Sequence, residues 1–203
     1  MFALVDKEDN SIVKMYSGTK GVLIGENQYP REIFTLWSEA DRNAIDIYTV
    51  ETDYSKKKDQ RWYTNTGLTY SFDGSKAKAS YGDATAKAHA DTLYTAQDET
   101  DGKGTEGDVK VEGLKTKLIK DIKSQAQAEL SKTDWYVTRK AEEDTAIPSA
   151  ITTHRKAVRS KQASMCTSIT NASDTPALET LYKYTEQEDG TRARPLGEIP
   201  TLE

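Results

Sequence analysis

The stretch of sequence that decides the fold runs from Leu114 to Ala172 and reads LKTKLIKDIKSQAQAELSKTDWYVTRKAEEDTAIPSAITTHRKAVRSKQASMCTSITNA. Apolar residues recur in it at intervals of three and four, the spacing that places side chains on one face of an α-helix. One such series lies before residue 142 and another after Pro148. The stretch therefore predicts two amphipathic helices joined by a loop at residues 142–148.

The first helix is expected to begin near Val109 to Val111. Thr133-Asp134 can cap a fresh start, so the pattern leaves open whether this helix continues through Trp135 to Lys140. Its apolar stripe consists of Val111, Leu114, Leu118, Ile122, Ala126 and Leu130.

The second helix is predicted to open with Pro148, which suits a first helical turn because its missing N–H has no partner there. Two stripes joined by a short loop favour an antiparallel pair, either self-closed or part of a larger coiled coil. The stripe of the second helix consists of Ile151, Val158, Met165 and Ile169.

Composition argues against one dense globular core. Hydrophobic residues make up 35% of the 203 residues, charged residues make up 30%, and the mean hydropathy is -0.76. The 11 tyrosines and 3 tryptophans argue against full disorder, since disordered chains are poor in aromatic residues. A molecule of small substructures, which completes its burial against partner chains, fits this composition best.

The net charge of -5 is unevenly distributed. Residues 109–172 carry 12 basic and 7 acidic side chains, whereas residues 1–108 carry 13 and 19 and residues 173–203 carry 3 and 7. A basic segment between acidic ones can bind an acidic partner or nucleic acid, but Lys-rich solvated helix faces are the more common explanation. We do not expect nucleic acid as a partner.

Residues 1–82 predict a small, mostly antiparallel β domain. Phe2–Val5 and Ile12–Tyr16 flank a polar turn and predict a β-hairpin. Ser38 is followed by acidic residues and predicts the N-cap of a short helix that ends near Ala44. The alternation from Ile45 to Val50 favours a strand, and Asp73-Gly74 favours a second hairpin.

The remaining segments predict little regular structure. Residues 83–108 form a linker, in which residues 84–96 are a short helix or extended chain and residues 98–108 are acidic and Gly-rich. Residues 173–203 form an extended tail with one short strand at Thr180–Thr185, which docks on a neighbouring chain or hangs free. The fold class is thus α+β: a small antiparallel β domain (1–82), a linker (83–108), an antiparallel α-helical hairpin (109–172) and an extended C-terminal tail.

The residue types of catalysis are present, but their spacing predicts no catalytic site. His154 and Cys166 lie twelve residues apart on one predicted helix, which separates them by roughly 18 Å, too far for a nucleophile and its base. Ser17–Gly21 lacks the spacing of a phosphate-binding loop. Lys56–Lys58 with Arg61-Trp62-Tyr63 mixes cations and aromatics, and a strand edge protected by lysines explains it better than nucleic-acid binding.

Metal, cofactor and membrane sites are not predicted either. Two histidines and Cys166, the single cysteine, are too few for a convincing metal centre or a disulfide framework. His89 is expected to be exposed, and the acidic stretch 98–108 does not follow the ligand register of a calcium loop. No apolar run is long enough to span a bilayer.

The phrase Leu130–Lys140, followed by Ala146-Ile147-Pro148 and His154–Arg159, resembles a helical-hairpin module of tailed-bacteriophage virion structural and tail-fibre-type proteins. That module has a Thr-Asp-Trp phrase with a following Arg, an Ile-Pro entry and a helix with paired arginines. Here the resemblance covers residues 114–172, and His154 stands where an aromatic is more usual. It implies no catalytic residues.

The resemblance implies a non-enzymatic virion structural protein of the tail, baseplate or fibre-attachment region, made in the bacterial host cytoplasm. Its partners would be other virion proteins and copies of itself in a symmetric assembly. A tail-fibre assembly chaperone that is absent from the mature virion is the alternative.

The Thr-Asp-Trp phrase suggests how the two helices are held together. Trp135 would lock the two helices near their turn, and its replacement by Ala would then cost about 3–5 kcal/mol. The surrounding arginines, Arg139, Arg155 and Arg159, would pair with Asp134, Glu142 or Glu143.

Overall fold

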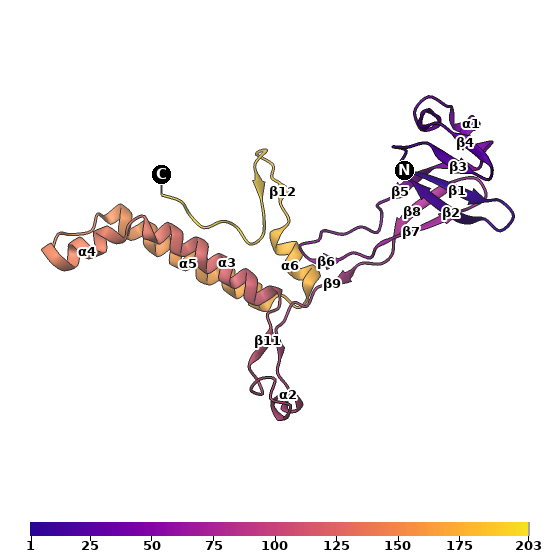
Figure 1. Cartoon of the computed structure of the whole chain (residues 1–203). Coiled ribbons are helices and arrows are strands. Elements are labelled where there is room, and N and C mark those ends of the chain that lie inside the picture. The colour runs from indigo at the N-terminus through magenta and orange to yellow at the C-terminus, as the bar shows by residue number, and fades with distance from the viewer. Residues whose placement is uncertain (203) are drawn as a thin grey trace. The chain divides into compact units, whose positions relative to one another are not determined.

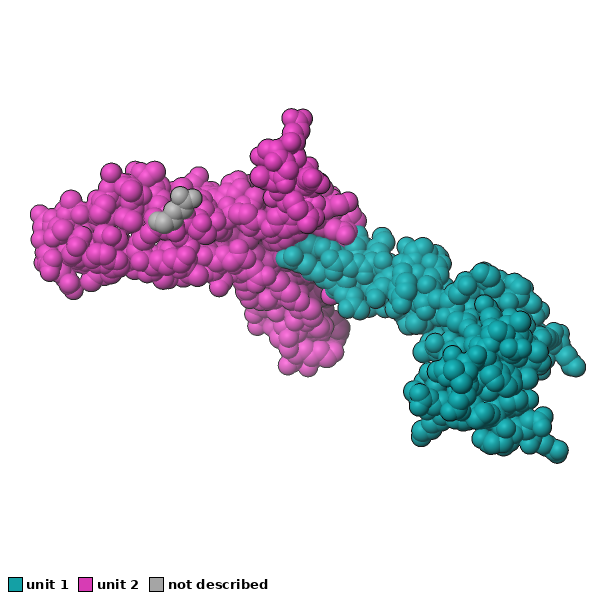
Figure 2. Space-filling view, turned by 90° about the horizontal axis from the view of Figure 1, so that it is seen from above, with its two compact units in different colours: residues 1–85 teal, residues 86–203 magenta. Residues whose placement is uncertain are grey.

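A computed structural model describes residues 1–202 of the chain. The chain divides into two compact units, Met1–Thr85 and Ala86–Glu203, coloured teal and magenta in Figure 2. Unit 1 is built mainly of strands and unit 2 mainly of helices (Figure 1), so the predicted α+β class is confirmed.

Unit 1 is organised around a five-stranded sheet in the order β2-β1-β5-β8-β7. Its neighbouring strands are antiparallel except for β5 and β8, which run parallel, with Val50 opposite Ala77. The edge strands β2 and β7 also contact each other, which indicates that the sheet is curled. The strands are β1 (Phe2–Asp6), β2 (Ser11–Tyr16), β5 (Ile47–Asp53), β7 (Leu68–Phe72) and β8 (Ala77–Tyr81).

Strand β1 is buried on both faces, because successive side chains of a strand point to opposite sides. Ala3 and Val5 pack into one core cluster with Tyr48, Phe72 and Ala77. Phe2 and Leu4 pack on the other side, against a second cluster that consists of Val22, Ile33, Phe34 and Ile47. The predicted hairpin of residues 2–16 is confirmed, and its strand β1 lies between the two clusters.

Short elements cover the second cluster. They are the hairpin β3 (Val22–Ile24) and β4 (Asn27–Tyr29), the 3₁₀ helix η1 (Arg31–Phe34) and helix α1 (Glu39–Asn43). Ser38 caps α1 as predicted: its Oγ accepts the Asp41 N–H at 3.1 Å, and the Asp41 carboxylate accepts the Ser38 N–H at 3.3 Å. The predicted hairpin at Asp73-Gly74 is also present, as the turn between β7 and β8.

Unit 2 is organised around α3 (Leu114–Ser131) and α5 (Ser149–Asn171), which pack against each other in Figure 1. A break at Lys132-Thr133 separates α3 from α4 (Asp134–Glu143), so the fresh start at Asp134 is the alternative that the structure adopts. The predicted helix start near Val109 to Val111 is wrong, because strand β11 (Val109–Val111) occupies these residues. Asp91 explains the later start: it accepts hydrogen bonds from the Gly113 N–H and the Thr116 hydroxyl, both at 2.7 Å.

The acidic part of residues 83–108 folds locally. Two-residue strand β10 (Thr92–Leu93) pairs with β11, and helix α2 (Ala96–Thr100) lies between them. Thr95 caps α2 in a capping box with Asp98, whose side chain also accepts a hydrogen bond from Lys110 Nζ at 2.8 Å. The short strand β9 (Thr85–Ala86), at the boundary between the units, pairs with β6 (Tyr63–Thr64).

The predicted strand at Thr180–Thr185 is wrong. Residues 175–182 form helix α6 (Thr175–Tyr182), which Asp174 caps by accepting the Ala177 N–H at 2.8 Å. Only β12 (Thr185–Glu186) is extended there, and it pairs with β13 (Arg192–Ala193). An Asp cap followed by Pro at the first turn is a helix-start signal, which outweighed the β-like Tyr and Thr residues.

Candidate functional site

Charged side chains meet inside the helical hairpin, where α3 ends and α4 begins. Arg155 on α5 is only 8% exposed. Its Nη1 donates to the Leu130 carbonyl at 2.8 Å and to Thr133 Oγ1 at 2.7 Å, and its Nη2 lies 2.9 Å from the Asp134 carboxylate. The Arg155 guanidinium therefore joins α5 to a backbone carbonyl in the last turn of α3 and to Asp134, the first residue of α4. We call these four residues the junction.

Glu129 on α3 is a second buried charged residue in this region and is 5% exposed. Its carboxylate is hydrogen-bonded by Lys132 and by the Leu202 N–H at 2.8 Å. These donors hold the pKa of Glu129 below its usual range. His154 Nε2 lies 3.2 Å from the same carboxylate, within ion-pair distance but without the alignment of a hydrogen bond.

The C-terminal tail reaches this region. Leu196 is buried and its N–H donates to the Leu181 carbonyl at 3.0 Å. Ile199 packs against an apolar cluster of Ala126, Leu130 and Val158. The expectation that the tail docks on a neighbour or hangs free is therefore wrong for this structure, because the tail is held by its own chain.

The predicted role of Trp135 as a buried lock is wrong. Trp135 is 52% exposed, and helix α4 contains no buried residue. Its indole stacks on the Tyr136 ring at a centroid distance of 3.8 Å, and the Arg139 guanidinium lies 4.7 Å from the indole centroid. Val137, on the same helix, is 43% exposed. We call Trp135, Tyr136, Val137 and Arg139 the α4 surface.

Of the predicted arginine pairs, only Arg155 with Asp134 is an ion pair in the structure. Arg139 contacts aromatic rings instead, and Arg159 is exposed. The periodicity gives the reason for this difference. Arg155 lies four residues after Ile151 and three before Val158, on the buried stripe, whereas Arg159 lies beside that stripe.

His154 and Cys166 both lie on α5, twelve residues apart, so the structure does not bring them together. Half-buried His89 accepts a hydrogen bond on its backbone carbonyl from the Lys115 N–H at 3.0 Å, which corrects its expected exposure. Among residues 1–202 no group of three or more His, Cys, Asp or Glu side chains is placed to hold a metal ion. Within the same residues no helix is both long and apolar enough to cross a membrane.

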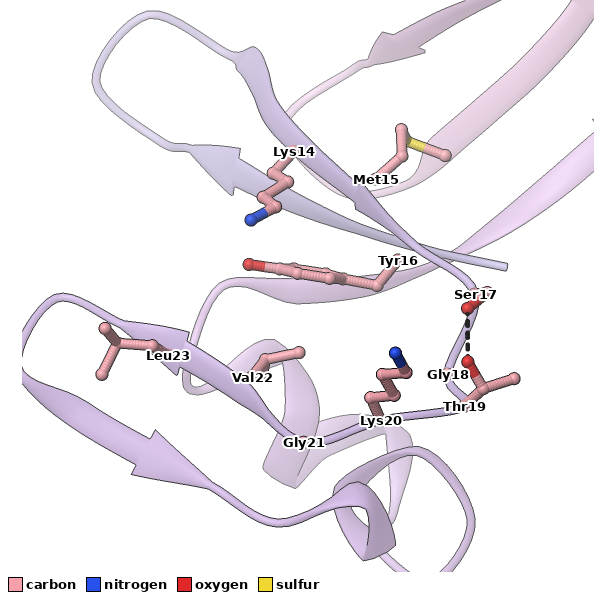
Figure 3. A pocket seen from close by; sticks show the side chains of 10 residues that line it. All are labelled: Lys14, Met15, Tyr16, Ser17, Gly18, Thr19, Lys20, Gly21, Val22 and Leu23. Atoms are coloured by element: carbon pink, nitrogen blue, oxygen red, sulfur yellow. Dashed lines mark hydrogen bonds between the residues drawn. The ribbon is translucent and has the colours of Figure 1, made fainter.

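The residues 17–21 line a pocket of about 340 Å³ in unit 1, together with the end of β2 and the start of β3. In Figure 3 the side chains of Lys14 and Lys20 lie on the same side as Tyr16, and Met15 points away. The hydroxyls of Ser17 and Thr19 bond to each other at 2.9 Å. Lys14 and Lys20 are exposed, so this pocket is an open surface hollow without a buried polar group.

The lysine-rich loop of unit 1 is bound to its own aromatics. Lys57 lies 5.5 Å from the Tyr54 ring centroid and 5.6 Å from that of Tyr81, and Lys58 lies 4.4 Å from that of Tyr63. Lys56 forms an ion pair of 3.0 Å with Asp83. These cations are engaged within unit 1. Lys56–Lys58 lie in the loop between β5 and β6 and not on a strand, so the interpretation of a strand edge protected by lysines is wrong.

Comparison of the chain with protein-family models, curated proteins and solved structures finds no match. The residues of the chain itself therefore supply the argument for function.

The sequence pattern did not single out Glu129. A signal for Glu129 was present, because it lies three residues after Ala126 and seven after Ile122, on the buried stripe of α3. A charged residue on such a stripe indicates a buried pair. The donor from Leu202 lies 73 residues away in sequence, and no local pattern predicts it.

Proposed function

We propose that this chain is a non-enzymatic structural protein of a tailed-bacteriophage virion that acts through subunit packing in the tail, baseplate or fibre-attachment region. The observation that carries the proposal is the large exposed surface of the chain, 13087 Å². Two separate compact domains of these sizes would expose about 11,400 Å² in total. Counted for the two units taken apart, the exposed surface is therefore larger than expected, and a partner chain is a natural cover for it.

The α4 surface indicates where such a partner binds. Trp, Tyr and Arg are the residue types most enriched in the centres of protein interfaces, and here all three are stacked on a helix without a fully buried residue. The resemblance of residues 114–172 to a phage module supports the phage origin. Copies of the chain and other virion proteins are therefore the partners we propose.

Mass spectrometry of purified virions tests this proposal. We expect the protein in mature particles, in a copy number that matches a symmetric ring or fibre, and its absence from them would overturn the proposal. A virus with Trp135→Ala should incorporate less of the protein into its particles, because the α4 surface is disrupted. The matched control is Arg159→Ala, at an exposed position of α5, which should not reduce incorporation.

A tail-fibre assembly chaperone is the alternative. The α4 surface would then bind fibre protein for a time and release it. The protein would co-purify with fibre subunits from infected cells and be missing from mature particles. A gel shift at low salt would instead point to the basic hairpin as a nucleic-acid site, and its affinity should fall steeply as salt is raised.

A further inference from the structure

The last twelve described residues, Thr191–Leu202, form a segment that is held at several separate places on unit 2. We call Glu129, Leu181 and the apolar cluster of Ala126, Leu130 and Val158 the tail site. Leu196 and Leu202 donate backbone hydrogen bonds to it, at 3.0 Å and 2.8 Å, and Ile199 supplies the apolar contact. The tail site therefore recognises a short extended peptide through both backbone and side chains.

Additional contacts attach the same segment near the end of α6. Arg194 lies with its guanidinium 5.0 Å from the Tyr182 ring centroid and 5.4 Å from that of Tyr184. Tyr184 also donates to the Glu198 carboxylate. All these partners precede residue 187, so the whole segment is bound by residues on the other side of one turn.

That turn, residues 187–191, is exposed along its length, and its hydrogen bonds are local: they lie within the turn or join the Gln187 side chain to Thr185. The Gln187 N–H donates to the Thr191 carbonyl at 2.8 Å, and the Gly190 N–H donates to the Gln187 carbonyl at 3.0 Å. Asp189 accepts from the Thr191 N–H and hydroxyl at 2.9 and 2.6 Å. Straightening the turn would therefore break local bonds without uncovering any core residue.

We propose that two copies of this chain exchange the segment Thr191–Leu202 by straightening the turn at 187–191, so that each segment occupies the tail site of the other copy. Every contact of the segment with the tail site, α6 and β12 is remade in the exchanged pair, because both copies have the same sequence. The two forms differ only in the turn and in chain entropy, which makes such exchange a low-cost route to a dimer. High local concentration favours the exchanged form.

The proposal names a partner, a second copy of this chain, and a surface that the proposed function does not specify. It also does not depend on the virion, since exchange is a property of the purified full-length chain. A failure to find the protein in virions and a failure to find exchange would therefore be separate results.

Cross-linking between two differently tagged, co-expressed full chains tests exchange. Both carry Cys166→Ser, one carries Lys132→Cys and the other Leu202→Cys. Lys132 and the Leu202 N–H bind the same Glu129 carboxylate, so a short bis-maleimide can join the two positions. We expect a covalent heterodimer that carries both tags.

A collision control replaces Lys132→Cys with Lys117→Cys, at an exposed position of α3 about 18 Å from residue 129 along the helix. The heterodimer yield should exceed this control by about tenfold if the segment dwells at the tail site of its partner, because a bound segment has a high effective concentration. A single chain with both cysteines shows whether the positions meet in one copy. Linkage only within that chain, or no linkage in either sample, would overturn the proposal.

A second variant shifts the balance between the two forms. Gly190 has φ of +78°, which proline cannot adopt, so Gly190→Pro should disfavour the closed turn and raise the dimerisation constant by about tenfold or more. Gly25→Pro is the matched control, because Gly25 also has a positive φ, of +59°, in a turn outside the segment. Sedimentation velocity should show more dimer for Gly190→Pro alone. Equal dimer content in both variants would contradict exchange.

Discussion

Helices α3 and α5 differ from α4 in what they bury, although all three lie in the continuous stretch from Leu114 to Ala172. The α3–α5 pair buries an apolar line, in which Ile122, Val158 and Met165 are at most 1% exposed. Helix α4 contains no fully buried residue, and its Trp135 is 52% exposed. The large aromatic is outside and the arginine is inside, the reverse of what residue type alone suggests.

The difference shows how one phrase serves two purposes. Thr133, Asp134 and Arg155 close the hairpin internally, because the Arg155 guanidinium bonds to the Leu130 carbonyl and to the side chains of Thr133 and Asp134 at the helix break. The next residues, from Trp135 to Arg139, lie on α4 beyond these hydrogen bonds. We expect the first three residues to stabilise the hairpin. In our proposal, the residues from Trp135 to Arg139 bind a partner.

The largest effect is expected at the junction. Replacing Arg155 with Met removes two hydrogen bonds from a buried charged group, those to the Leu130 carbonyl and Thr133 Oγ1. The free energy of unfolding of unit 2 should fall by about 3–5 kcal/mol. Chemical denaturation followed by circular dichroism measures the loss. The control Arg159→Met, at an exposed position, should change stability by less than about 0.5 kcal/mol. A near-neutral Arg155→Met would show that the junction does not hold the hairpin.

The apolar line gives the next effect. Met165 is 1% exposed, and Met165→Ala should cost about 2–5 kcal/mol because it leaves a cavity between the helices. Val137→Ala on α4 removes a side chain that is 43% exposed and should cost less than about 0.5 kcal/mol. Similar losses for the two variants would erase the distinction between the α3–α5 pair and α4.

Trp135→Ala should have a small effect on stability, about 1 kcal/mol or less, since only its contacts with Tyr136 and Arg139 are lost. Its effect should appear in association instead. Sedimentation of the variant, alone and mixed with candidate partner proteins, should show weaker complexes than the wild type forms. A large drop in melting temperature with unchanged association would place Trp135 among the residues that hold the fold.

The smallest effect concerns pH and the tail. The hydrogen bond from Lys132, with that from the Leu202 N–H, lowers the pKa of Glu129, and His154 faces the same carboxylate. A depressed pKa in the folded state adds stability that is present above the usual value near 4.5 and is lost as the pH falls through the folded pKa. The Leu202 amide resonance should therefore shift as the tail is released on acidification, and in Glu129→Gln this titration should be absent. A shift that persists in Glu129→Gln would assign the transition to another group.

Local signals predicted much of the fold. The hairpin at residues 2–16, the Ser38 cap, the turn at Asp73-Gly74 and the two helical stripes each depend on residues close in sequence, where turn chemistry and periodicity act directly. The strand predicted at Thr180–Thr185 was wrong because a local helix-start signal was missed, whereas two other errors arose where distant residues decide. Asp91 fixes the start of α3 from 22 residues away, and the tail bonds to Glu129 from 73 residues away.

The sequence by itself determined which residues of the hairpin are periodic, where turns and caps fall, and that the chain is α+β with a modest share of apolar residues. Only the tertiary structure decided that Arg155 and Glu129 lie inside, that Trp135 lies outside, and that the tail binds its own chain. The physical reason is that periodicity fixes the face on which a side chain lies. What covers that face is set by contacts between segments far apart in the chain.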